Sequence, residues 1–138
     1  MQKKILLSLA LISVTLFGIG QNAWINELHY DNVSSDVGEF VEVVIENPGS
    51  YTLSDFEVYL YNGSSSSGAT YSNESMNNFT VGTTVGNFTI YTWYPSSIQN
   101  GAPDGLALVY QGTVISNQFL SYEGTFTATD GPANGLTS

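Results

Sequence analysis

The sequence contains no cysteine, and after residue 4 it contains no lysine or arginine. The absence of cysteine excludes disulfide bonds, thiolate zinc sites and a cysteine-linked lipid anchor. Twelve Asp and Glu side chains and one histidine remain, so the formal net charge of −10 becomes −12 once Lys3 and Lys4 are removed. Recognition of phosphate and nucleic acid rests on Lys and Arg contacts. We therefore expect no direct binding of nucleic acid.

The first twenty residues have the pattern of a secretory signal peptide. Two lysines precede an apolar stretch over residues 5–19, and Gly18 and Gly20 are small residues suited to a cleavage site. Cleavage is predicted after Gly20 or, alternatively, after Ala23. The apolar stretch is short for a bilayer span, and no other segment is long enough. We therefore expect a secreted protein, extracellular or at the cell surface, without a membrane span after signal removal.

The mature chain, residues 21–138, is long enough for one domain with its own core. It reads as short strands separated by clusters of Gly, Asn, Ser and Asp, and no helical period is sustained. Gln111–Gly112 is typical of a tight hairpin turn. The pattern predicts an all-β antiparallel sandwich. The expected strands cover residues 24–30, 39–46, 56–61, 88–94, 106–110 and 113–122.

The densest group of acidic residues lies between residues 27 and 42. Asp31 and Glu42 stand at the ends of a window of EF-hand length, but Val33 and Gly38 do not fit that motif, so an EF-hand is rejected. With no cationic side chain nearby, two alternatives stay open: a solvated acidic loop, or an oxygen cage for Ca²⁺ that includes carbonyls of the 31–38 loop. The candidate calcium ligands are Glu27, Asp31, Asp36, Glu39 and Glu42.

Glu27 is the most unusual of these residues because strict alternation places it on the same face as Ile25, the expected core side. A buried carboxylate costs several kcal/mol unless it is paired or hydrogen-bonded. Glu27 must therefore accept backbone or hydroxyl hydrogen bonds, become protonated or bind a metal. The remaining alternative is that the strand is bulged and Glu27 points outward.

His29 is the only imidazole in the sequence, so any histidine-dependent catalysis must use it. Neither a Gly-x-Ser-x-Gly nucleophile motif nor a His-Glu-x-x-His zinc motif is present. We interpret His29 as a structural residue at a strand end and predict that this chain is not an enzyme. Trp24, Trp93 and the tyrosines are expected to pack in the core and on the sheet faces, with stacking on sugars as the alternative.

Several segments, taken in order, resemble the bacterial secreted lamin-tail domain family. The resemblance begins at residues 25–32 and 36–42, and it continues through residues 52–56, 59–63, 98–109 and 119–126. It implies an immunoglobulin-like β-sandwich, here without its last strand, because the family pattern continues beyond residues 131–138. Asp55–Phe56 stands where the family often has Gly-Trp, which changes packing and not the assignment.

Family members usually form part of larger secreted proteins, and several of those carry an extracellular nuclease or an endonuclease/exonuclease/phosphatase domain further along. The resemblance therefore implies a non-catalytic module for adhesion, targeting or spacing. Its expected partners are downstream domains of the same polypeptide and a cell-surface or extracellular polymer. The alternative is the N-terminal part of a secreted nuclease or phosphatase whose catalytic domain lies beyond Ser138. No catalytic residue of those enzymes maps onto this chain, and no cofactor besides Ca²⁺ is suggested.

Overall fold

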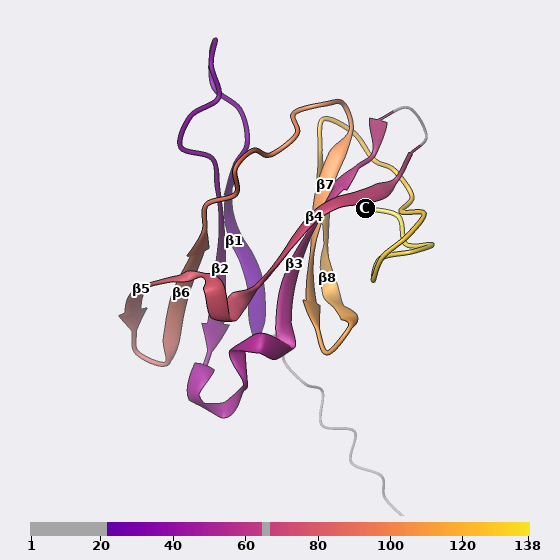
Figure 1. The fold of residues 1–138 in the computed structure, drawn as a ribbon. Helices are drawn as coiled ribbons and strands as arrows, with labels where there is room; N and C mark the ends of the chain where they lie inside the picture. The colour runs from indigo at the N-terminus through magenta and orange to yellow at the C-terminus, as the bar shows by residue number, and fades with distance from the viewer. Residues whose placement is uncertain (1–21, 65–66) are drawn as a thin grey trace, which may run out of the picture.

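The computed structural model describes residues 22–64 and 67–138, so the predicted signal peptide, residues 1–20, lies outside the described residues. Eight strands form two four-stranded antiparallel sheets that pack against each other (Figure 1). The prediction of an all-β, immunoglobulin-like antiparallel sandwich is confirmed. Sheet A has the order β1 (Ala23–His29), β2 (Phe40–Glu46), β6 (Phe88–Trp93) and β5 (Thr80–Val85). Sheet B has the order β4 (Ala69–Ser75), β3 (Phe56–Asn62), β7 (Asp104–Tyr110) and β8 (Thr113–Tyr122).

Short 3-10 turns connect some of these strands. They are η1 (Pro48–Ser50), η2 (Leu53–Asp55) and η4 (Met76–Asn78), and η4 carries the chain from sheet B to sheet A. The six strands expected from the sequence are all present, whereas β4 and β5 were not predicted. The described residues include no helix of the length and apolarity that a membrane span requires.

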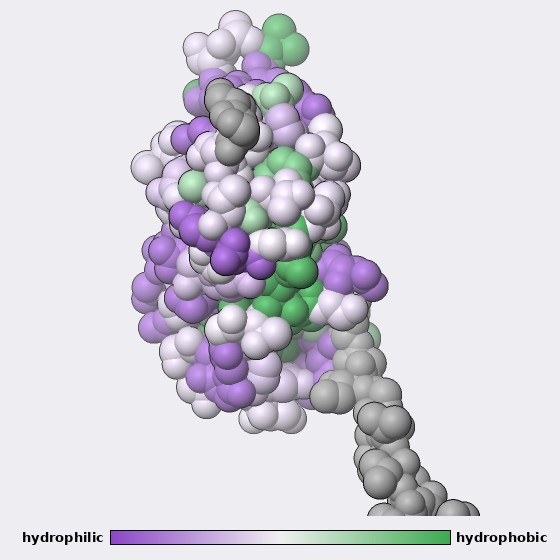
Figure 2. Space-filling view, turned by 90° about the vertical axis from the view of Figure 1, so that its right-hand side faces the viewer, coloured by the Kyte–Doolittle hydropathy of each residue, from purple (hydrophilic) through white to green (hydrophobic). Residues whose placement is uncertain are grey.

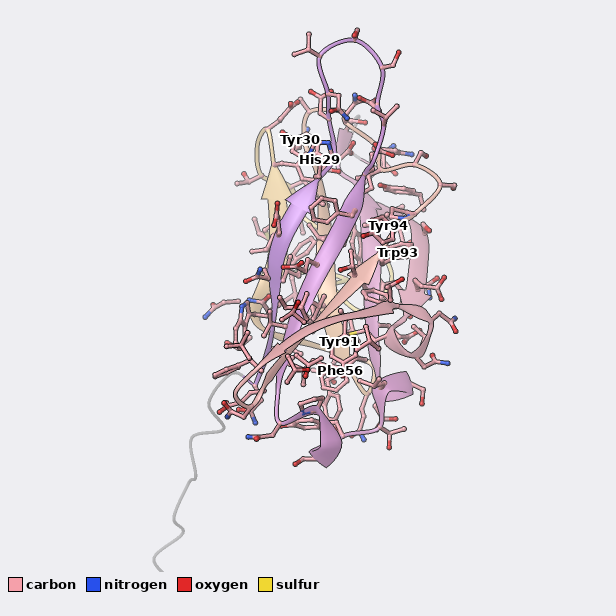
Figure 3. All side chains as sticks on the ribbon, turned by 90° about the vertical axis from the view of Figure 1, so that its left-hand side faces the viewer. His29, Tyr30, Phe56, Tyr91, Trp93 and Tyr94 are labelled. Atoms are coloured by element: carbon pink, nitrogen blue, oxygen red, sulfur yellow. The ribbon has the colours of Figure 1, made fainter. Side chains whose placement is uncertain are left out.

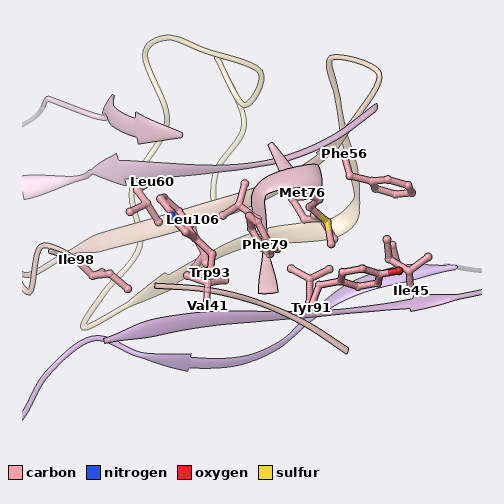
Figure 4. Packing of buried hydrophobic residues seen from close by; sticks show 14 residues of the cluster. Val41, Ile45, Phe56, Leu60, Met76, Phe79, Tyr91, Trp93, Ile98 and Leu106 are labelled. Carbon is pink, nitrogen blue, oxygen red and sulfur yellow. The ribbon is translucent and has the colours of Figure 1, made fainter. Parts of the chain in front are cut away.

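The main core lies between the two sheets and follows the alternation of the sequence. In β2, Val41, Val43 and Ile45 are fully buried, while Glu42 and Glu46 lie on the outer face. Burying a side chain of this size contributes about 1.5–3 kcal/mol. Trp93 belongs to the same core, where its ring stacks on Phe79 at a centroid distance of 6.0 Å (Figure 4).

A second apolar cluster lies on the outer side of sheet B, beneath residues 126–138, which we call the C-terminal segment. Backbone hydrogen bonds close this segment on itself, and the Thr129 N–H donates to the Gly68 carbonyl at 2.8 Å beside β4. Tyr61 is therefore fully buried, and its hydroxyl accepts the Ala133 N–H at 3.0 Å. The buried members are Tyr61, Ala107, Val109, Phe126, Ala128 and Ala133.

Close packing under the C-terminal segment requires a glycine at residue 63. A Cβ atom added there would lie 2.4 Å from Cδ1 of Phe126 and 2.7 Å from the Pro103 carbonyl oxygen.

Figure 2 looks onto the sheet B side of the molecule and shows a small hydrophobic area among polar and neutral residues. A groove of about 510 Å³ lies between β8 and the end of the C-terminal segment, and both apolar and neutral polar side chains line it.

Candidate functional site

Glu27 lies on the outer face of sheet A, because β1 is bulged. The register of the β1–β2 pair shifts between Ile25 and Glu27, so Glu27 stands opposite Glu42 rather than on the core side. Its side chain is exposed. Strict alternation was therefore wrong for this residue, and the bulged alternative is confirmed. Glu27 avoids the cost of burying a carboxylate by pointing into solvent.

The other carboxylates of this group form separate hydrogen bonds. Glu42 Oε1 accepts the Asn26 side-chain N–H at 2.6 Å on the outer face of sheet A. Asp36, at the exposed loop before β2, accepts the backbone N–H of Asn32 at 3.1 Å and the side-chain N–H of Asn100 at 3.2 Å. Asp31 is exposed in the same loop. Asp36 thus helps to hold this loop against the connection between β6 and β7.

Glu39 is buried at the end of that loop, directly before β2. Its Oε2 accepts the Ile98 N–H at 2.9 Å, which again joins the loop to the β6–β7 connection. Its Oε1 is also buried, and no donor among the described residues reaches it. Hydrogen bonds from N–H groups to a carboxylate contribute more than those between neutral groups. The hydrogen bonds of Glu39 and Asp36 therefore hold the loop before β2 against the β6–β7 connection.

The five candidate calcium ligands are not brought together. Within residues 22–64 and 67–138, no three or more His, Asp or Glu side chains form a group that could hold a metal ion. Ca²⁺ takes six to eight oxygen ligands, so two facing carboxylates such as Glu27 and Glu42 are insufficient on their own. Of the two alternatives, the geometry favours the solvated acidic loop for Asp31 and Asp36, whereas Glu39 at its end is buried.

Asp104, which no sequence motif marks as a site residue, is the most deeply buried carboxylate of the described residues, with 1% of its surface exposed. It is the first residue of β7. Its Oδ1 accepts the Gly63 N–H at 3.0 Å and its Oδ2 accepts the Gly101 N–H at 2.8 Å. Burial raises the pKa of Asp104, and the backbone N–H groups of Gly63, Gly101 and Ser64 oppose that rise. Asp104 thereby fixes the ends of two loops far apart in the sequence.

Three tyrosines surround this end of the sandwich. The Tyr71 hydroxyl accepts the Gln99 N–H at 2.9 Å, and the Tyr122 hydroxyl donates to the Gln99 carbonyl at 2.5 Å. Tyr30 stacks on Tyr122 at a centroid distance of 4.0 Å, which joins the end of β1 to the end of β8. Burial raises the pKa of Tyr71 to about 12, and it raises the pKa of Tyr122 as well, with Tyr71 and Asp104 adding to that rise. These hydroxyls are structural donors and acceptors, not acids that titrate near neutral pH.

The outer face of sheet A carries a row of aromatic rings across three neighbouring strands. His29 at the end of β1 lies 5.9 Å from Phe40 at the start of β2, and Phe40 lies 6.3 Å from Tyr94 just after β6, measured between ring centroids. Tyr94 is 63% exposed. Figure 3 looks onto this sheet and labels His29 and Tyr94, near the loop that follows β1. The facing carboxylates Glu27 and Glu42 lie on the same outer face.

The tryptophans divide between the core and the surface. Trp93 is buried and stacked on Phe79, which confirms the expectation of core packing and removes it as a surface for sugars. Trp24 is half-buried on the outer face of sheet A, where its ring meets Phe88 edge-on at 5.9 Å.

His29 is the last residue of β1 and is half-buried, as expected of a structural histidine at a strand end.

Comparisons with protein-family models, with curated proteins and with solved structures found no match to this chain.

Proposed function

We propose that this chain is a secreted, non-catalytic β-sandwich module that serves adhesion, targeting or spacing within a larger extracellular protein. Its contact surface is the outer face of sheet A. The resemblance to the secreted lamin-tail domains supports the same role, as does the secretory pattern of the first twenty residues.

The observation that carries this proposal is the difference between the two outer faces. On sheet B the C-terminal segment buries Tyr61, Ala107 and Val109, so that part of the face belongs to a core. On sheet A no chain segment takes that position among the described residues, and the row of His29, Phe40 and Tyr94 reaches solvent. Aromatic residues with one face free are enriched where proteins meet their ligands.

The chemistry of the outer face of sheet A fits a neutral, hydroxyl-rich polymer. Aromatic rings pack against the apolar faces of sugar rings, and carboxylates such as Glu27 and Glu42 accept hydrogen bonds from hydroxyl groups. An anionic polymer is disfavoured, because the mature chain has no Lys or Arg to pair with it. We therefore propose a neutral extracellular or cell-surface polysaccharide as the ligand.

The test is binding of the purified protein to insoluble polysaccharides and to a glycan array. We expect binding to at least one neutral glycan, and we expect Tyr94→Ala and Phe40→Ala each to weaken it about five- to tenfold, or roughly 1–1.4 kcal/mol. Leu120→Ala on β8, also a surface residue at 38% exposure, is the matched control and should leave affinity unchanged. Absence of binding, or binding that survives both aromatic substitutions, would contradict the proposal.

The non-catalytic part of the proposal has its own test. Phosphoryl transfer needs Arg, Lys or a metal to neutralise charge on the phosphoryl oxygens. The protein should therefore give no turnover of plasmid DNA or a phosphodiester with magnesium, manganese or calcium. Turnover above a heat-killed control that is lost in His29→Ala or Glu42→Gln would replace the binding module with an enzyme.

A further inference from the structure

β5 is an edge strand with one paired side. It lies at the end of sheet A, next to β6, and all six of its residues are exposed (Figure 1). An edge strand presents backbone N–H and C=O groups that can pair with a further strand. Natural proteins usually cover such an edge or place charged residues or proline on it.

The other edges of the sandwich are covered or tied. On β1, the Ile25 N–H donates to Gln118 Oε1 of β8 at 2.6 Å, so the edges of β1 and β8 meet each other. On β4, the Thr70 N–H donates to Asp130 Oδ1 at 2.7 Å, which places the C-terminal segment along that edge. β5 has no such contact among the hydrogen bonds of the described residues.

β5 also lies in the longest uncharged part of the mature chain. Between Glu74 and Asp104 the sequence contains no Asp, Glu, Lys, Arg or His. Two apolar side chains of this edge strand are exposed: Val81 by 62% and Val85 by 66%. Carboxylates do come near the two ends of β5, where Glu74 accepts the Asn78 side-chain N–H and Glu46 accepts the Asn87 side-chain N–H, each at 2.7 Å. β5 itself carries no charge, so two copies can pair along it without placing a carboxylate in the contact between the strands.

We propose that β5 pairs with β5 of a second copy, antiparallel across a twofold axis, and so joins two A sheets edge to edge. A twofold contact uses the same surface on both copies, and a neutral apolar edge is complementary to itself. A basic partner strand is disfavoured because no residue of β5 itself offers it a carboxylate. This inference rests on β5 alone and does not depend on the proposed function.

The geometry limits the strength of this contact. The register between β5 and β6 shifts between Val81 and Thr84, so a bulge divides the edge into two short halves. Few backbone hydrogen bonds can then form between copies, and the contact area is small. We expect a reversible dimer with a Kd in the micromolar to millimolar range, not an obligate one.

The test is sedimentation velocity over a concentration series at low and at high salt. The dimer should strengthen with salt, because the Debye length falls from about 10 Å at 0.1 M to about 3 Å at 1 M and screens the repulsion between two acidic copies. Val85→Glu should weaken the dimer at least tenfold. Val37→Glu, at a site 67% exposed in the loop after β1, adds the same charge and should have little effect.

Hydrogen exchange locates the contact independently of these variants. Amides of β5 should gain protection as the protein concentration rises, while amides of the loop after β1 should not. A protein that stays monomeric at millimolar concentration in 1 M salt would overturn the inference. Equal weakening by Val85→Glu and Val37→Glu, or protection confined to another strand, would overturn it as well.

Discussion

Replacing Asp104 with alanine tests how much the buried carboxylate contributes to the fold. The substitution removes the hydrogen bonds to Gly63 at 3.0 Å and Gly101 at 2.8 Å, and it leaves the buried Gly63 N–H without an acceptor. A hydrogen bond to a charged group contributes about 1.5–3 kcal/mol, so two give about 3–6 kcal/mol. Desolvation of the carboxylate already offsets part of this gain. We therefore expect the free energy of unfolding to fall by about 3 kcal/mol, a large share of the roughly 5–15 kcal/mol typical of a domain.

Urea unfolding followed by tryptophan fluorescence measures this change, because Trp93 is buried in the main core and will respond to its loss. Asp31→Ala is the matched control: the same substitution at an exposed site should change the free energy of unfolding by no more than about 0.5 kcal/mol. If Asp104→Ala costs no more than Asp31→Ala, the carboxylate does not fasten the two loops and our reasoning about this end of the sandwich is refuted.

The raised pKa of Asp104 also predicts how the stability of the protein changes with pH. Burial raises the pKa of Asp104 above its ordinary 3.8, so the folded protein holds this proton more tightly than the unfolded chain does. The resulting contribution to stability is fully present below the unfolded pKa and is lost as the pH rises through the folded pKa. Asp104→Asn should therefore gain less stability than the unmodified protein on acidification from neutral pH towards the ordinary pKa of aspartate. An equal gain would contradict this account.

Three further predictions concern the N-terminus, calcium and alkaline pH. N-terminal sequencing of secreted protein should begin at Gln21 rather than Trp24, because cleavage after Ala23 would remove a residue that is 2% exposed and paired in β1; a Trp24 start would be the contrary result. Calcium should raise the Tm no more than magnesium at equal ionic strength, since the five candidate ligands do not converge, and a calcium-specific rise would refute this. Burial raises the pKa of Tyr71 to about 12, so the contribution of this tyrosine to stability is lost as the pH rises from 10 to 12. Tyr71→Phe should therefore reduce the loss of stability at alkaline pH, and an unchanged loss would contradict this prediction.

The sequence predicts the strands that bury one apolar face. Alternation in residues 41–45 and in residues 56–60 marks β2 and β3, and the Gln111–Gly112 turn marks the hairpin of β7 and β8. It does not predict β4 or β5, because their composition is rich in Ser, Thr, Asn and Gly and their pairing is set by β3 and β6. Edge strands with little buried surface leave little hydrophobic pattern.

The candidate sites were harder to predict than the strands. One extra residue in β1 moves Glu27 from the core face to solvent. A single-residue shift of this kind exchanges the two faces of a strand, so the alternation of the sequence then predicts the wrong face. The burial of Asp104 depends on N–H groups from Gly63 and Gly101, whose approach is a property of the tertiary fold. The aromatic row likewise forms only because β6 lies beside β2, which sequence order does not reveal.

The attachment of the C-terminal segment determines how the sandwich carries mechanical load. β1 is held along its length by the ladder to β2, whereas the C-terminal segment is held by the small apolar cluster beneath it and by separate hydrogen bonds, such as those of Thr129 and Ala133. Tension between Ala23 and Ser138 therefore acts in shear on β1 and peels the C-terminal segment one contact at a time. We expect the segment to yield first and to uncover Tyr61 and Val109, while both sheets stay intact. Under force the molecule would lengthen and expose a new apolar surface before it unfolds.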